Sequence, residues 1–356
     1  MYLTPFSIFL LFARLVQGIA VNITTAATEL FILETSHEDI RGKLMASLSF
    51  SRYMGAVFIF GIGATMISWR LQALISCLVS AVPSFILLFF FPTSPRFLVA
   101  KKKLKDAEKS LIFYRGPHKD IKDEMDKIKF VLQSTESQGF VMQIKFLMRK
   151  KVLKNFSLLL LIAAGTQFSG QGIFLAYVGP IIEEAMPQSN PFLWSIVMSL
   201  VRVVGSIVFG ILTIFSRRII FLIFCLLSVV SLLLFGVDQF IMYSLELQVF
   251  PWWVSIICLC SLMIFVSILT PTAVLMIGEI LPTTCRSLGY VITDLTFYLS
   301  YFMITFTFPF LKDLIHMHGV LWLYSVLIFL VAWVPLLYLP ETKGKNLEDI
   351  QIKLYS

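Results

Sequence analysis

Two glutamines stand in an apolar run of the second half of the chain and could bind a small solute. Gln167 and Gln171 are four residues apart, so a helix would present both amides on one face. Amides match hydroxyl groups through hydrogen bonds, and an amide inside a membrane helix is costly enough to indicate a purpose. The alternative for Gln167 is a hydrogen bond to a neighbouring helix.

Ionisable side chains inside apolar runs form a second candidate group. Glu29, Arg202 and Asp294 each lie within such a run. A charge in hydrocarbon is costly unless it is paired, so each of these residues is a functional hypothesis. We expect Arg202 to pair with Asp294 or Glu29, or to meet an anionic substrate. Glu29 and Asp294 could alternatively carry a proton.

Motifs of nucleotide binding and metal-dependent hydrolysis do not occur in the sequence. It contains neither a Gly-rich phosphate loop ending in Lys-Ser/Thr nor a His-Glu-x-x-His motif. His316 and His318 could suggest a metal, but two histidines in a predicted external loop are more often solvated. We therefore predict neither an enzyme nor a cofactor.

The composition requires these residues to be positioned inside a lipid bilayer. Hydrophobic residues make up 58% and charged residues 14% of the 356 residues, against roughly 45–50% and about 25% in soluble domains. The mean hydropathy is +0.87. The five cysteines lie in or beside apolar runs and form no legible disulfide framework.

Apolar runs long enough to cross a bilayer, roughly 17–25 residues each, recur nine times and predict an all-α polytopic membrane protein. Each run must be helical because backbone groups in hydrocarbon need internal hydrogen-bond partners. The predicted spans are 8–31, 46–66, 71–91, 156–181, 192–214, 219–238, 252–276, 286–309 and 319–339.

A basic segment, residues 92–155, separates the third and fourth spans. It holds 16 of the 29 Lys and Arg residues but only seven of the 21 acidic residues. Helical spacing of Leu104, Ala107, Leu111 and Tyr114 predicts a short amphipathic helix there. We interpret the segment as a solvated cytoplasmic loop; the alternative is that it binds anionic lipid headgroups.

The distribution of cations gives the orientation. With residues 92–155 in the cytoplasm and alternating spans, 24 of the 29 Lys and Arg residues fall on the cytoplasmic side, as the positive-inside rule requires. The predicted organisation is a three-span bundle in 1–91, the loop in 92–155, a six-helix bundle in 156–339 and a cytoplasmic tail in 340–356. The protein is predicted to be a multi-pass protein of the plasma membrane.

Short motifs at the helix ends resemble those of the sugar porters of the major facilitator superfamily. The segment 92–98, Pro-Thr-Ser-Pro-Arg-Phe-Leu, resembles the Pro-Glu-Ser-Pro-Arg-Trp-Leu signature after their sixth helix. The segment 340–345, Pro-Glu-Thr-Lys-Gly-Lys, matches their C-terminal signature, and 278–282, Gly-Glu-Ile-Leu-Pro, resembles the segment after the tenth helix. Within that family, the sequence resembles the insect facilitated trehalose and hexose transporters.

The resemblance implies a facilitator that lacks counterparts of its first three helices. It assigns Gln167, Gln171 and Tyr298 to substrate binding, at positions matching the seventh and eleventh helices. It also implies a conformational latch at the cytoplasmic ends of the helices, with Glu34 and Arg41 in the first half and Glu279, Arg218 and Arg286 in the second. Arg217 is expected only to orient its helix.

The predicted function is therefore transport of a small polar solute, a hexose or trehalose, by alternating-access facilitated diffusion. The expected partners are the sugar and the lipid bilayer, without nucleic acid or a metal. The alternative from another class is a truncated or non-transporting member of the family that acts as a sensor or interaction protein.

Overall fold

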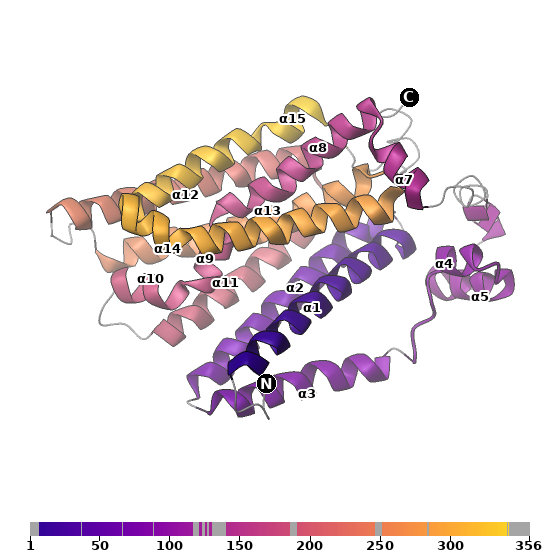
Figure 1. Cartoon of the computed structure of the whole chain (residues 1–356), viewed down its shortest axis with the longest axis horizontal. Coiled ribbons are helices and arrows are strands. Elements are labelled where there is room, and N and C mark those ends of the chain that lie inside the picture. The colour runs from indigo at the N-terminus through magenta and orange to yellow at the C-terminus, as the bar shows by residue number, and fades with distance from the viewer. Residues whose placement is uncertain are drawn as a thin grey trace.

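The chain folds entirely into helices and connecting turns in the residues that its structure describes, which confirms the predicted all-α class (Figure 1). The structure is a computed structural model. It describes residues 7–36, 38–65, 67–87, 89–116, 121–122, 125–126, 128–129, 140–185, 191–245, 251–282, 285–339 and 341.

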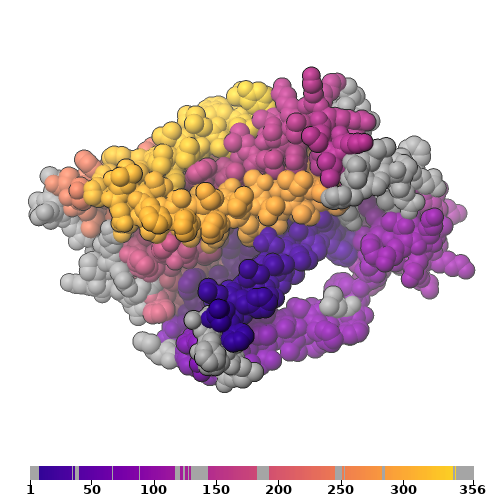
Figure 2. Space-filling model, viewed as in Figure 1, coloured from indigo at the N-terminus to yellow at the C-terminus, as the bar shows by residue number. Residues whose placement is uncertain are grey.

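The first three long helices are α1 (Ser7–Thr35), α2 (Glu38–Ala64) and α3 (Trp69–Leu87). Helix α1 packs on α2, α13 and α14, and α2 packs closely on α11, which joins the two halves of the molecule. None of the side chains described in α3 is buried. Helix α3 contacts α2, and Figure 2 shows open space beside another part of α3.

The basic segment contains α4 (Pro95–Ala100), α5 (Leu104–Arg115) and α7 (Phe140–Leu147). Helix α5 confirms the predicted amphipathic helix, since it buries Ala107 and Leu111 and exposes most of its charged side chains. Arg115 Nη1 donates to the carbonyl of Thr35 at 2.7 Å. This contact ties the segment to the end of α1; we call the ends of the helices on this side the loop end.

The second half forms the main core. Helix α12 packs between α13 and α14, and α11 packs on α13. Large side chains such as Phe209, Phe221 and Phe235 are fully buried there. The elements are α8 (Lys150–Gly165), η1 (Thr166–Ser169), α9 (Gln171–Ala176), α10 (Val178–Ala185), α11 (Pro191–Leu212), α12 (Arg217–Leu245), α13 (Trp252–Ile280), α14 (Arg286–Ala332) and α15 (Val334–Tyr338).

Eight helical segments of the described chain are long and apolar enough to cross a membrane. The last runs from Arg286 to Tyr338, 53 residues, about 80 Å at 1.5 Å per residue, against a hydrocarbon core of about 30 Å. Its helical backbone is interrupted at His316, where φ is 59° and ψ is 173°. This segment contains both of the last two predicted spans, so the count of nine stays a prediction.

Gly205 provides a test of the packing between α11 and α13. A Cβ at this position would lie 1.8 Å from Ser267 Oγ and 3.0 Å from the carbonyl oxygen of Ile264, whereas a Cβ at Gly55 in α2 would meet nothing within 4 Å. Gly205→Ala should therefore lower the apparent melting temperature in detergent. Gly55→Ala should be neutral or slightly stabilising, because Ala is the better helix former. Equal melting temperatures for the two variants would contradict this packing.

Candidate functional site

Gln167 occupies an interruption in a predicted span. The run 156–181 is divided into α8, the 3-10 turn η1 and α9, and Gly170 between η1 and α9 has a left-handed φ of 85°. A side chain there would be strained and its Cβ would lie 2.8 Å from the Phe174 ring. Broken helices of this kind form substrate sites in transporters because they expose polar groups at membrane depth.

The Gln167 side chain is buried without a hydrogen-bond partner. It is 1% exposed, and neither Oε1 nor Nε2 has a partner in the described structure. Leaving a buried amide unsatisfied costs about 1–3 kcal/mol for each group. Such a side chain has its hydrogen-bonding capacity available for a ligand.

Gln171 already has a partner on another helix. Its Oε1 accepts a hydrogen bond of 2.6 Å from Thr270 Oγ1, which links α9 to α13. The interhelical hydrogen bond considered as the alternative for Gln167 is thus found at Gln171. The hydroxyl of a bound solute would have to share or replace this bond.

Tyr298 lines a small cavity between the two halves of the molecule. The cavity has a volume of about 30 Å³, room for about two water molecules and far too little for a hexose. Gln167 is not among its described lining residues, so the structure does not bring the two predicted substrate contacts to one cavity. The polar lining residues are Thr25, Glu29, Arg52, Thr270, Tyr290, Thr293, Asp294 and Tyr298.

Glu29 lies at the centre of a buried network in this cavity wall. Its Oε1 pairs with Arg52 Nη2 at 2.9 Å, and its Oε2 accepts a short hydrogen bond from the Tyr290 hydroxyl. Glu29 and Tyr290 are buried, whereas the Arg52 side chain is 44% exposed. Glu29 therefore connects α1 to α2 in its own half and to α14 in the other.

The expected pairing of Arg202 with Asp294 or Glu29 is wrong in this structure. The Arg202 guanidinium carbon lies 4.3 Å from the centre of the Tyr53 ring, a cation–π contact between α11 and α2. The cation beside Glu29 is Arg52. Arg52 lies within the predicted span 46–66, but its partner could not be predicted, because the rotation of α2 about its axis decides which side chain faces α1.

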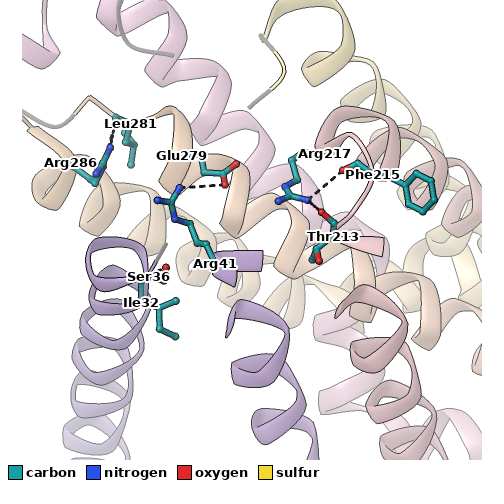
Figure 3. Close-up of polar contacts among 9 residues, drawn as sticks. All are labelled: Ile32, Ser36, Arg41, Thr213, Phe215, Arg217, Glu279, Leu281 and Arg286. Atoms are coloured by element: carbon teal, nitrogen blue, oxygen red, sulfur yellow. Dashed lines mark hydrogen bonds and ion pairs between the residues drawn. The ribbon is translucent and has the colours of Figure 1, made fainter. Parts of the chain in front are cut away.

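Arg41 and Glu279 form a buried ion pair between the two halves at the loop end. Arg41 Nη1 of α2 lies 3.7 Å from Glu279 Oε1 of α13, and the side chains are only 8% and 6% exposed (Figure 3). The prediction placed Arg41 with Glu34 in the first half. The Glu34 side chain lies outside the described residues, and the ion pair that the structure gives Arg41 crosses to the other half.

The contacts described for Arg286 and Arg218 lie within the second half. Arg286 donates from Nε and Nη2 to the carbonyl of Leu281 at 3.3 Å (Figure 3). Arg218 Nε lies 3.6 Å from Glu341 Oε2, and its Nη1 donates to the carbonyl of Leu339. These contacts fasten the start of α12 to the chain after α15.

Arg217 does more than orient its helix. It is buried, its Nη1 donates a short hydrogen bond to the carbonyl of Thr213, and its backbone nitrogen donates to Glu341 Oε1 at 3.1 Å. The signal that sequence analysis could have used is the glutamate of the C-terminal segment, which is the shared acceptor for Arg217, Arg218 and Ser216.

The two histidines lie within the helical segment α14 and contact aromatic side chains, instead of standing alone in a loop. The ring centres of His316 and Tyr243 are 4.3 Å apart, and those of His318 and Trp322 are 5.4 Å apart. Among the described residues, no group of three or more His, Cys, Asp or Glu could hold a metal ion.

Sequence comparison connects this geometry with known proteins. The family model described as "Sugar (and other) transporter" matches residues 2–354. The facilitated trehalose transporters Tret1 of Bombyx mori and Apis mellifera ligustica are 28% and 26% identical to the chain. Each alignment covers 96% of this chain and 68% of the relative. The Tret1 of Drosophila pseudoobscura pseudoobscura is 25% identical, and 39% of its length is covered.

Solved structures share the fold. The proton:xylose symporter XylE of the major facilitator superfamily, bound to 6-bromo-6-deoxy-D-glucose, gives a TM-score of 0.78 at 21% identity. That match covers 92% of this chain and 70% of the symporter. The inward-open xylose transporter XylE from E. coli gives a lower TM-score of 0.65 at 18% identity, covering 92% and 68%.

Proposed function

Because the chain belongs to the sugar (and other) transporter family, we propose that it carries a hexose or trehalose across a membrane by facilitated diffusion. The chain is an integral, multi-pass membrane protein with the fold of the major facilitator superfamily. The proposed substrate is inferred from the sequence similarity to the trehalose transporters. We also propose that the membrane is the plasma membrane, with the loop end and the C-terminus in the cytoplasm.

The observation that carries the proposal is the buried Arg41–Glu279 pair between the halves. Alternating access needs two halves that rock against each other around a central site. An ion pair between the two halves stabilises the conformation in which the halves meet at this end. It must break in the conformation in which they separate there, so it is a two-state element. Its closed form here supports a conformation that is sealed at the loop end.

In the proposed cycle the solute enters from the side opposite the loop end and reaches Gln167. The unpartnered amide would form hydrogen bonds to solute hydroxyls, and gaining these bonds favours binding. The cavity beside Tyr298 is too small for a hexose in the described conformation. Solute binding therefore requires the halves to separate at this level, and the Glu29 network must adjust as they do.

Uptake into proteoliposomes tests the proposal. The purified chain should take up radiolabelled hexose or trehalose faster than empty vesicles, and Gln167→Ala should reduce the initial rate by about tenfold, since the loss of one or two hydrogen bonds is worth about 1–3 kcal/mol. Gln239→Ala is the matched control, because Gln239 is also a buried amide but lies near the far end of α12.

Two outcomes would contradict these assignments separately. No uptake above empty vesicles by the parent chain would contradict transport by this chain. Undiminished uptake by Gln167→Ala, together with normal uptake by the Gln239 control, would remove Gln167 from the site but leave the transport proposal standing.

One observation favours a second candidate, a non-transporting family member. Helix α3 has no buried side chain in the described structure, and α1 exposes large apolar side chains such as Ile8, Leu11 and Phe12. A first half with so much uncovered surface could serve as a membrane interaction module. Correct insertion and folding of the parent chain without any uptake would support this candidate.

A further inference from the structure

Arg202 is a buried cation at mid-span for which the described structure gives no ion pair. It lies about halfway along α11 and is 5% exposed, and its Nε has no hydrogen-bond partner. The contact that the described structure gives its guanidinium is a cation–π contact with the face of the Tyr53 ring. Tyr53 is itself only 3% exposed, so water does not surround the pair.

Arginine cannot lower the cost of this position by losing its proton, because its guanidinium stays charged in proteins. A desolvated cation–π contact compensates for part of the lost hydration. A buried cation without a counter-ion nevertheless remains costly. The arrangement is explained if an anion from outside the chain completes the site.

Tyr301 of α14 lies between Arg202 and the start of α9. Arg202 is close enough to Tyr301 of α14 to act on it electrostatically. The Tyr301 ring in turn lies 3.1 Å from the position of a Cβ on Gly172, the neighbour of Gln171 in α9. An electrostatic interaction between Arg202 and Tyr301, and the packing of the Tyr301 ring against Gly172, therefore place the cation on the side of α14 that faces the start of α9.

Neither carboxylate of the cavity forms a described ion pair with Arg202. Glu29 forms an ion pair with Arg52. Asp294 interacts electrostatically with both Glu29 and Arg52. Asp294 precedes Tyr301 on α14 by seven residues, or about 10 Å along the helix axis. An Arg202–Asp294 ion pair would have to bridge this offset.

We propose that Arg202 binds the carboxylate of a sugar acid, so that a hexuronate is a substrate of the transport site; this rests on the proposed transport function. Guanidinium binds carboxylate through paired hydrogen bonds and is enriched where such groups are recognised. One cation matches one negative charge. A sugar phosphate, with a charge of about −1.5 to −2 as a phosphomonoester at neutral pH, would leave negative charge uncompensated.

The experiment compares three radiolabelled solutes in proteoliposomes: glucose, glucuronate and glucose 6-phosphate. The parent chain should take up glucuronate. Arg202→Gln should lower glucuronate uptake by about tenfold while glucose uptake changes by less than about twofold. Arg202→Lys should retain part of the glucuronate uptake. Arg70→Gln is the matched control, since Arg70 also contacts an aromatic ring, Trp69, but lies at an exposed end of α3.

A binding measurement separates this inference from the transport proposal. Glucuronate should raise the apparent melting temperature of the detergent-solubilised parent chain but not that of Arg202→Gln. If glucose enters the vesicles while glucuronate neither enters nor stabilises the protein, the inference fails and the transport proposal stands. If no solute enters but glucuronate stabilises the parent through Arg202, the transport proposal fails and the anion site stands.

Three further results would overturn the inference. Equal loss of glucose and glucuronate uptake in Arg202→Gln would assign Arg202 a structural role. Restoration of glucose uptake by Asp294→Asn in the Arg202→Gln background would show that the two residues pair with each other. Uptake of glucose 6-phosphate in preference to glucuronate would reject the carboxylate assignment in favour of phosphate.

Discussion

Glu279→Gln should open the loop end of the molecule and reduce solute uptake by about tenfold or more. Removing one partner of a buried ion pair is destabilising, typically by roughly 3–5 kcal/mol. Here the cost falls on the conformation in which Arg41 and Glu279 meet, so the population shifts toward the conformation that separates them. Each 1.4 kcal/mol changes that equilibrium about tenfold.

A native cysteine reports this shift. Cys285 lies beside Arg286 at the loop end and is 1% exposed, whereas Cys225 is buried within α12. In a Cys77→Ser background, which removes the exposed cysteine of α3, Glu279→Gln should speed labelling of Cys285 by a small thiol reagent. Cys225 should stay unlabelled in the same sample and thereby show that the protein remains folded.

Charge exchange distinguishes a pair from two independent residues. The double variant Arg41→Glu with Glu279→Arg should recover part of the uptake that each single variant loses. Cys285 should also return toward its parental labelling rate. If the double variant loses as much as the two single variants together, or if Glu279→Gln leaves both uptake and labelling unchanged, the latch is not formed by this pair.

Among the variants at membrane-spanning positions, Glu29→Leu should cause the largest decrease in the apparent melting temperature. The buried Tyr290 hydroxyl would lose its acceptor, at about 1–3 kcal/mol. Arg52 would lose its ion-pair partner, which adds less because this side chain is 44% exposed. The first and second halves would lose a shared contact at the same time.

Size-exclusion chromatography after heating measures this effect in detergent. Glu29→Gln keeps an acceptor for Tyr290 but removes the charge, so it should fall between the parent and Glu29→Leu. Arg52→Gln should cost less in the Glu29→Gln background than in the parent, since the two residues interact. The exposed Glu108→Gln in α5 is the control. A melting temperature of Glu29→Leu equal to that of the control would contradict the network.

The interruption within 156–181 marks a limit of prediction from the sequence. The run is continuously apolar enough to predict one helix, yet Gly170 adopts a left-handed φ and divides it. Glycine is compatible with either conformation, so its presence alone does not locate a break. The packing of Phe174 and Leu232 against Gly170 belongs to the folded molecule.

The resemblance to sugar porters identified the latch residues as a group but not their pairing. Arg41, Glu279, Arg218 and Arg286 all lie at the loop end, as their positions at helix ends require. The structure pairs Arg41 with Glu279 and directs Arg218 to Glu341. Motif positions fix the depth of a side chain, whereas its partner depends on which helices are neighbours.

The amino-acid sequence was sufficient to predict a helical membrane protein and the position of its basic segment. These properties depend on the local sum of apolar area and on the position of charges along the chain, so neighbouring residues decide them. The sequence was not sufficient to predict that Arg52 rather than Arg202 faces Glu29, or that Arg202 lies over the Tyr53 ring; these contacts become visible in the folded molecule. Each residue turns a helix by about 100°, and the rotation and depth of every helix are fixed by packing against helices that are distant in the sequence.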